Sequence, residues 1–167
     1  MKLIEFRNDL QILRAFAVLF VFFFHLDINL FNFGYLGVDI FFFISGYLIT
    51  KILYSNYLNF NKLEIKNFFL KRALRILPLY FIVIFLSVIT FSQILSPYHL
   101  KELIESSNYS VFFLSNIFFL QKFNYFDLEA IYKPLLHTWS LGIEMQFYLI
   151  YPFLLLTLLS KFSGSKI

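Results

Sequence analysis

The residues of this sequence most able to do chemistry are ionisable side chains inside long apolar stretches. Arg14 and His25 share the stretch 10–30 and are 11 residues apart. In a helix this separation is about 1100°, within about 20° of three full turns, so both side chains point from one face, about 16 Å apart along the axis. Because the pKa of histidine lies near neutrality, His25 is a candidate general base.

A second group of polar side chains leads into the last apolar stretch, 141–159. Glu144 lies about one turn inside it and seven residues after His137, so the two share a face if the helix reaches that far back. The other members of the group are Trp139, Ser140, Gln146 and Tyr148. Trp139 and Tyr148 alone are typical of an aromatic belt, whereas a carboxylate inside an apolar stretch indicates function.

A third group is cationic. Arg72 follows directly after Lys71, and Arg75 lies about one helical turn further along. They either mark the cytoplasmic side of a membrane and attract anionic lipid, or they hold the phosphates of a cofactor through charge-assisted hydrogen bonds.

The block 37–48 carries one acidic residue and one pair of small residues. Asp39 is either a helix-start charge that complements the helix dipole or part of a site, and both interpretations stay open. Ser45 and Gly46 predict a close contact between helices.

The composition identifies the solvent around these groups. The 167 residues are 60% hydrophobic and only 14% charged, with no cysteine. A soluble domain carries about 25% charged residues, so a soluble or disordered protein is excluded. The absence of cysteine also excludes a disulfide scaffold and a thiolate metal site. The chain is therefore an integral membrane protein.

Four stretches are long and apolar enough for a bilayer, which needs about 20 residues per helix. The predicted spans are 10–30, 36–54, 76–95 and 141–159. The fold class is therefore all-α, a polytopic transmembrane helix bundle. The stretch 109–120 is too short to span and predicts an interfacial or re-entrant piece.

Lysine and arginine predict the orientation. Ten of the 14 lie before the first span, around the loop 55–75 or after the last span. The segments on the other side carry three, which are Lys101, Lys122 and Lys133. The N-terminus, the loop and the C-terminus are therefore predicted to be cytoplasmic.

The cytoplasmic loop itself predicts an amphipathic helix. Asn61 and Glu64 resemble a capping box, and leucines recur on one face at Leu63, Leu70, Leu74 and Leu77. This helix is expected to run into the third span, with Pro78 where it enters the bilayer.

Four blocks now stand in order: Arg14 with His25, the block 37–48, the block 71–80 and the block 137–148. Together they resemble the N-terminal part of the acyltransferase 3 family, bacterial integral-membrane enzymes that O-acylate cell-envelope sugars. The resemblance covers residues from about 7 to 159. The block 137–141 is most similar to the branch whose members often carry a C-terminal periplasmic hydrolase-like domain.

The resemblance implies a reaction and roles for these residues. An acyl group, commonly acetyl from acetyl-CoA, is delivered to a hydroxyl of lipopolysaccharide O-antigen, peptidoglycan or exopolysaccharide at the inner membrane. His25 would be the catalytic base or acyl relay beside Arg14, Arg72 and Arg75 would hold the coenzyme, and Glu144 would orient or activate a hydroxyl. The remaining motif positions are Asp39, His137, Trp139, Ser140, Gln146 and Tyr148.

The expected ligands and partners follow from the same resemblance. Acyl-CoA is a co-substrate, no cofactor is expected to stay bound, and three histidines without helical pairing predict no metal site. Lys71 and Met145 depart from the family pattern, which usually has arginine and glutamate there. The expected partners are the lipid bilayer, acyl-CoA and a glycan acceptor, and no nucleic acid.

The expected domain is a single partial membrane domain, 1–167, because family members have more spans than four. The chain is then a fragment, or a half-protein whose missing spans come from a partner chain. A non-enzymatic membrane subunit and a transporter-like conduit are the alternatives from other functional classes.

Overall fold

The computed structural model describes residues 7–60, 65–122 and 132–163, and every regular element within these ranges is helical. The chain forms two compact units, 1–61 and 62–167. Four helices are long and apolar enough to cross a membrane: Asn8–His25, Leu36–Leu58, Ile65–Ser92 and Thr138–Lys161. The predicted all-α fold with four spans is confirmed.

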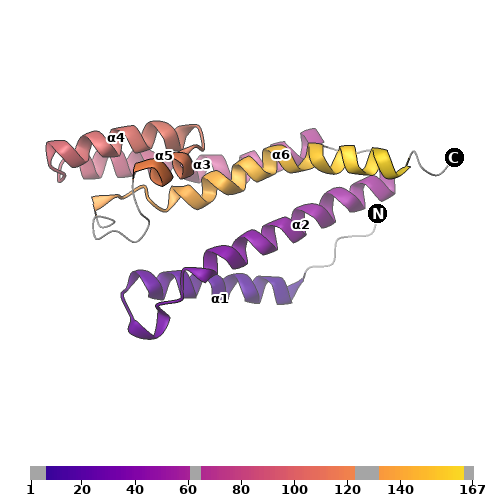
Figure 1. Ribbon diagram of the computed structural model, residues 1–167, viewed down its shortest axis with the longest axis horizontal. Coiled ribbons are helices and arrows are strands. Elements are labelled where there is room, and N and C mark those ends of the chain that lie inside the picture. The colour runs from indigo at the N-terminus through magenta and orange to yellow at the C-terminus, as the bar shows by residue number, and fades with distance from the viewer. Residues whose placement is uncertain (1–6, 61–64, 123–131, 164–167) are drawn as a thin grey trace. The chain divides into compact units, whose positions relative to one another are not determined.

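The first unit is a helical hairpin of α1 (Asn8–His25) and α2 (Leu36–Phe60), joined through the short 3-10 helix η1 (Asn29–Phe31) (Figure 1). The predicted first span, 10–30, is too long. The helix ends at His25 because Asp27 adopts a left-handed conformation with φ of 57°. Its backbone N–H donates to the Phe24 carbonyl, 3.1 Å away, which closes the helix end.

Two glycines allow the hairpin to close tightly. A Cβ added at Gly34 would lie 2.2 Å from the Phe20 carbonyl oxygen, and one at Gly37 would lie 2.4 Å from that of Ala17. The close helix contact predicted at Gly46 is wrong, because a Cβ there would meet no described atom within 4 Å. The glycines that allow α1 and α2 to approach are therefore Gly34, just before α2, and Gly37, in its first turn.

The second unit begins with α3 (Ile65–Ser92), which joins the predicted cytoplasmic helix and the third span without a break. Pro78 lies inside this helix. Its last residue is Ser92, three residues before the predicted end of the span. The expected capping box at Asn61 and Glu64 lies outside the described residues.

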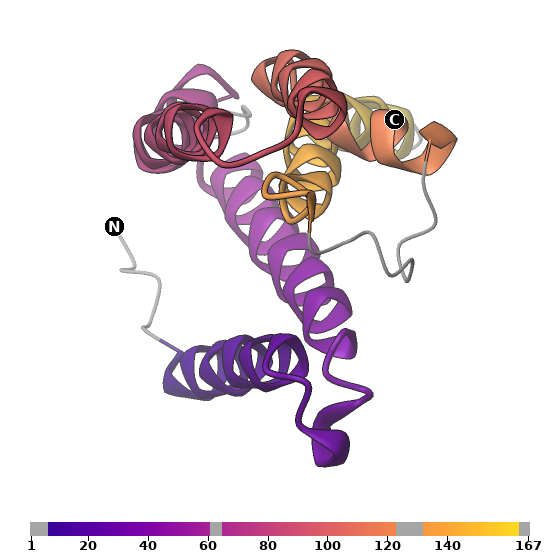
Figure 2. The same cartoon turned by 90° about the vertical axis from the view of Figure 1, so that its left-hand side faces the viewer.

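Two shorter helices follow, α4 (Pro97–Val111) and α5 (Ser115–Lys122). The apolar stretch 109–120 is divided between them by a break at Phe113, where φ is 58°. Figure 2 shows α4 between α3 and α5. Although α4 was not predicted, its signals are in the sequence: Pro97 stands at the helix start, and apolar residues recur at helical spacing.

The last helix, α6 (Thr138–Ser163), is fixed to the others by a buried core. The rings of Tyr80 on α3 and Phe113 stack with centroids 4.8 Å apart, and the Tyr80 hydroxyl donates to the Ser110 carbonyl at 2.8 Å. The Ser110 Oγ and Thr138 Oγ1 atoms lie 3.0 Å apart, and both residues are fully buried. This polar contact holds the start of α6 against α4.

Candidate functional site

The hairpin unit carries the predicted pair Arg14 and His25 on one unbroken helix, α1. His25 is its last residue, and the imidazole Nδ1 lies 2.8 Å from the Val21 carbonyl oxygen. Because a carbonyl only accepts, this hydrogen bond requires a proton on Nδ1. Neutral His25 therefore carries its free lone pair on Nε2, and the side chain is exposed. The nitrogen that could accept a proton is therefore Nε2.

Arg14 lies three turns earlier on α1, half-buried. Its Nε atom is buried and has no hydrogen-bond partner among the residues that the structure describes. A buried donor without a partner costs about 1–3 kcal/mol, and more when it is charged. Arg14 therefore keeps a buried donor that no described group satisfies.

Asp39 lies in the first turn of α2, one turn or less beyond the tight glycine contact, and its side chain is exposed. This position is compatible with both interpretations of the carboxylate. Ser45 is buried, 4% exposed, further along the same helix.

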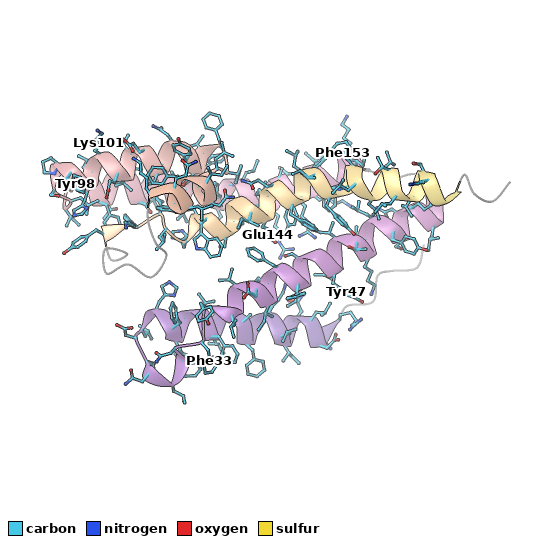
Figure 3. The ribbon with its side chains drawn as sticks, in the orientation of Figure 1. Phe33, Tyr47, Tyr98, Lys101, Glu144 and Phe153 are labelled. Atoms are coloured by element: carbon cyan, nitrogen blue, oxygen red, sulfur yellow. The ribbon has the colours of Figure 1, made fainter. Side chains whose placement is uncertain are left out.

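In the second unit, three predicted site residues meet. The Arg72 guanidinium lies over the Tyr148 ring, with its carbon 5.1 Å from the ring centroid. The Tyr148 hydroxyl donates to the carboxylate of Glu144, one turn earlier on α6. Figure 3 shows Glu144 on α6, and Tyr148 is the eleventh of the 26 residues of that helix. Arg72 is thus held against the middle of α6.

The three cationic side chains of α3 differ in their surroundings. Arg72 is half-buried and contacts two aromatic rings, those of Tyr148 and Phe68, whereas Lys71 and Arg75 are exposed. Neither Arg72 nor Arg75 forms a hydrogen bond or an ion pair with another side chain in the described ranges. Both guanidinium groups keep donors for a ligand.

The side-chain amide of Gln146 forms hydrogen bonds that hold helices together. Its Nε2 atom donates to the Phe113 carbonyl at 2.8 Å and to the Asn116 Oδ1 at 2.9 Å, and Asn116 Nδ2 lies 3.3 Å from the Gln146 Oε1. These bonds tie α6 to the break between α4 and α5. The structure therefore uses the amide of Gln146 to satisfy backbone and side-chain groups there.

His137 does not share a helical face with Glu144, because it precedes the first residue of α6, whereas Ser140, four residues before Glu144, lies on that face. The helix begins at Thr138, one residue after His137, which is exposed. The Ser140 hydroxyl donates to the His137 carbonyl at 3.2 Å. Trp139 is half-buried in the first turn.

Sequence reasoning missed a cluster around α4. The His99 ring stacks on Tyr132 with centroids 4.7 Å apart, and its Nδ1 lies 3.4 Å from the Glu102 Oε2. Glu102, Tyr132 and the buried Lys133 line a small pocket. Charged residues at helical spacing in 97–111 are the signal that could have placed these side chains on a helix.

An ion pair joins α4 to α5. The Lys122 ammonium donates to the Glu105 carboxylate, and this hydrogen bond lowers the pKa of Glu105 and raises the pKa of Lys122. Among the described residues, no three His, Cys, Asp or Glu side chains come together as a metal site would require.

Comparisons with known proteins bear on this arrangement. Residues 7–167 match the family model described as an acyltransferase domain. The chain is 39% identical over 156 residues to the O-acetyltransferase OatA of Staphylococcus aureus (strain NCTC 8325). The aligned residues cover 93% of this chain and 26% of that protein. No solved structure matches the chain.

Two further relatives have similar coverage. Identity is 40% over 156 residues to the peptidoglycan O-acetyltransferase OatA of Listeria monocytogenes, or 93% of this chain and 25% of that protein. It is 42% over 144 residues to the putative peptidoglycan O-acetyltransferase YrhL of Bacillus subtilis, or 86% and 23%. The chain thus spans about a quarter of the length of the relatives it matches.

Proposed function

The chain belongs to the acyltransferase 3 family, and on this premise we propose that it forms part of a membrane-bound O-acyltransferase. The reaction moves an acyl group, acetyl in the first instance, from acyl-CoA to a hydroxyl of a cell-envelope glycan. Peptidoglycan is the proposed acceptor, because the names of two relatives state that activity.

The observation that carries this proposal is the hydrogen bond from His25 Nδ1 to the Val21 carbonyl. It leaves Nε2 as an acceptor on an exposed ring. In the proposed step, the acceptor hydroxyl attacks the thioester carbonyl and its proton passes to Nε2. The carbon–sulfur bond then breaks, and the thiolate takes that proton to leave as free coenzyme thiol, so the acyl group ends as an ester.

The proposed coenzyme site uses Arg72 and Arg75. A coenzyme A phosphate needs donors in a planar fork, which guanidinium groups supply better than ammonium groups. Arg75 is exposed, and Arg72 is held by rings rather than by hydrogen bonds to other side chains of the described ranges. Both residues therefore suit an anionic ligand.

Two other site residues have proposed roles. Glu144 would orient or activate a hydroxyl, a role supported by its position well inside α6. Arg14, with its buried Nε unsatisfied, would bind the carbonyl oxygen of an acyl group or another polar group of the substrate.

The proposed location is the bacterial inner membrane, with the N-terminus in the cytoplasm. Four apolar helices support a multi-pass protein, and the ten-to-three distribution of lysine and arginine supports this orientation. The activity is proposed for the assembled protein, including whatever corresponds to the other three quarters of the relatives, whether a further chain segment or a partner chain.

The test is His25→Asn, measured as acetyl transfer from acetyl-CoA to peptidoglycan in membranes that contain the assembled protein. The asparagine amide keeps an N–H donor near the position of Nδ1 but has no equivalent of the basic Nε2. We expect a loss of about 10²–10⁴-fold in rate with an unchanged amount of inserted protein.

The matched control is His99→Asn, the same change at a histidine that pairs with Glu102 and stacks on Tyr132. It should retain transfer. Normal transfer by His25→Asn would leave His25 without a catalytic role and would remove the main support for the proposal.

A further inference from the structure

Tyr148 stands between a cation and a carboxylate. Its ring lies under the guanidinium of Arg72, 5.1 Å from centroid to carbon, and its hydroxyl donates to Glu144. The side chain is buried, only 3% exposed, and Phe68 packs edge-on against its ring with centroids 6.3 Å apart. One tyrosine thus contacts two of the proposed functional residues of this unit, Arg72 and Glu144.

The two contacts of Tyr148 use different parts of the side chain. A cation is attracted by the electron-rich face of an aromatic ring, and this attraction requires no hydroxyl. A hydrogen bond to a carboxylate is charge-assisted and requires the hydroxyl alone. Removing the hydroxyl should therefore disturb Glu144, and removing a ring should disturb Arg72.

The two contacts of Tyr148 come from two different helices. Glu144 and Tyr148 are one turn apart on α6, so the hydroxyl reaches the carboxylate along one face of one helix. Arg72 comes from α3, and it contacts the rings of Phe68, from its own helix, and Tyr148, from the other. Cation–π contacts leave its N–H donors for phosphate oxygens.

We propose that Tyr148 is a positioning residue that orients Glu144 through its hydroxyl and Arg72 through its ring. This inference rests on the proposed function, because it takes Arg72 as a coenzyme contact and Glu144 as a group that acts on the acceptor hydroxyl. Tyr148 itself touches no reacting atom in this arrangement. It sets the two sites at a fixed separation.

The experiment separates kcat from the KM for acetyl-CoA in membranes containing the assembled protein. Tyr148→Phe keeps the ring and should lower kcat about tenfold or more, the range for a lost hydrogen bond to a charged group, with KM unchanged. Phe68→Leu removes the other ring at Arg72 and should raise KM several-fold with kcat unchanged. Tyr148→Leu removes both contacts and should change both constants.

The matched control is Tyr151→Phe, the same change less than one turn further along α6, where the ring stacks on Phe147. It should behave as wild type. The inference is overturned if Tyr148→Phe also behaves as wild type, or if Tyr148→Phe and Phe68→Leu change the same constant. The proposed function fails separately, if wild-type membranes transfer no acetyl group.

Discussion

The tight contact at the start of α2 makes a strong prediction about the hairpin unit. A Cβ at Gly37 would lie 2.4 Å from the Ala17 carbonyl oxygen and 2.8 Å from the Val21 Cγ2. Ordinary contact begins at 3.4 Å, so the two backbones must separate by about 1 Å in Gly37→Ala. Forced overpacking of this kind costs about 1–3 kcal/mol.

Gly46 on the same helix supplies the matched control. An added Cβ there meets nothing described within 4 Å, so Gly46→Ala should gain up to about 1 kcal/mol of helix propensity without a steric cost. Since both variants make the same chemical change within α2, the difference between them reports mainly the steric term of about 1–3 kcal/mol.

Thermal unfolding of the purified protein in detergent measures this difference. For a chain of this size, about 1 kcal/mol shifts the midpoint by about 2–4 °C. Gly37→Ala should therefore unfold several degrees below Gly46→Ala. Equal midpoints would refute the close approach of α1 and α2, and with it the placement of His25 at the tight end of the hairpin.

Three further predictions concern orientation, the coenzyme and pH. A reporter fused after Lys161 should behave as cytoplasmic, and periplasmic activity there would overturn the orientation. Arg75→Lys should raise the KM for acetyl-CoA about tenfold, because it replaces a planar fork of donors by a point charge. The control variant Lys66→Arg should leave the KM unchanged. An unchanged KM in Arg75→Lys would leave Arg75 as an orientation signal. The Glu105–Lys122 pair lowers the pKa of Glu105 from its ordinary 4.5 and raises that of Lys122 from 10.5, so its stabilisation should persist between these values and disappear below the folded-state pKa of Glu105. The difference in unfolding midpoint between wild type and Glu105→Gln, measured against pH, checks this, and a difference that persists in strong acid would contradict it.

Much of the fold could be predicted from the sequence, because membrane spans are set by length and apolarity alone. The exact helix ends could not. The left-handed backbone of Asp27 ends α1 early, whereas α2 continues through polar residues to Phe60. A search for apolar stretches detects neither of these helix ends. Helix α4 was missed for a related reason, since a search for spans passes over a helix with a polar face.

The candidate site was predictable in its residue types but not in its groupings. A helical repeat places Arg72 and Arg75 about 60° apart, yet only packing shows that Arg72 contacts the rings and Arg75 stays exposed. The partner of Gln146 is Asn116, 30 residues away, and no local pattern indicates that pair. Tyr148 was predicted as a motif position, but its link between two charged groups required coordinates.

The hydrogen bonds of the polar groups divide them into two classes. Tyr80, Ser110 and Gln146 have their partners within the second unit, so their hydrogen bonding is already satisfied by packing. The buried Nε of Arg14 and the donors of Arg72 have no hydrogen-bond partner in the described ranges.

In a bilayer each unsatisfied polar group costs several kcal/mol, so a span that keeps such a group needs a compensating partner elsewhere. Satisfied groups explain how the helices hold together, and they would do so in a protein with no activity. Arg14 is different, because packing within its own unit leaves its buried Nε without a partner among the described residues. This distinction, rather than polarity itself, favours an enzyme or a binding protein over a purely structural membrane subunit.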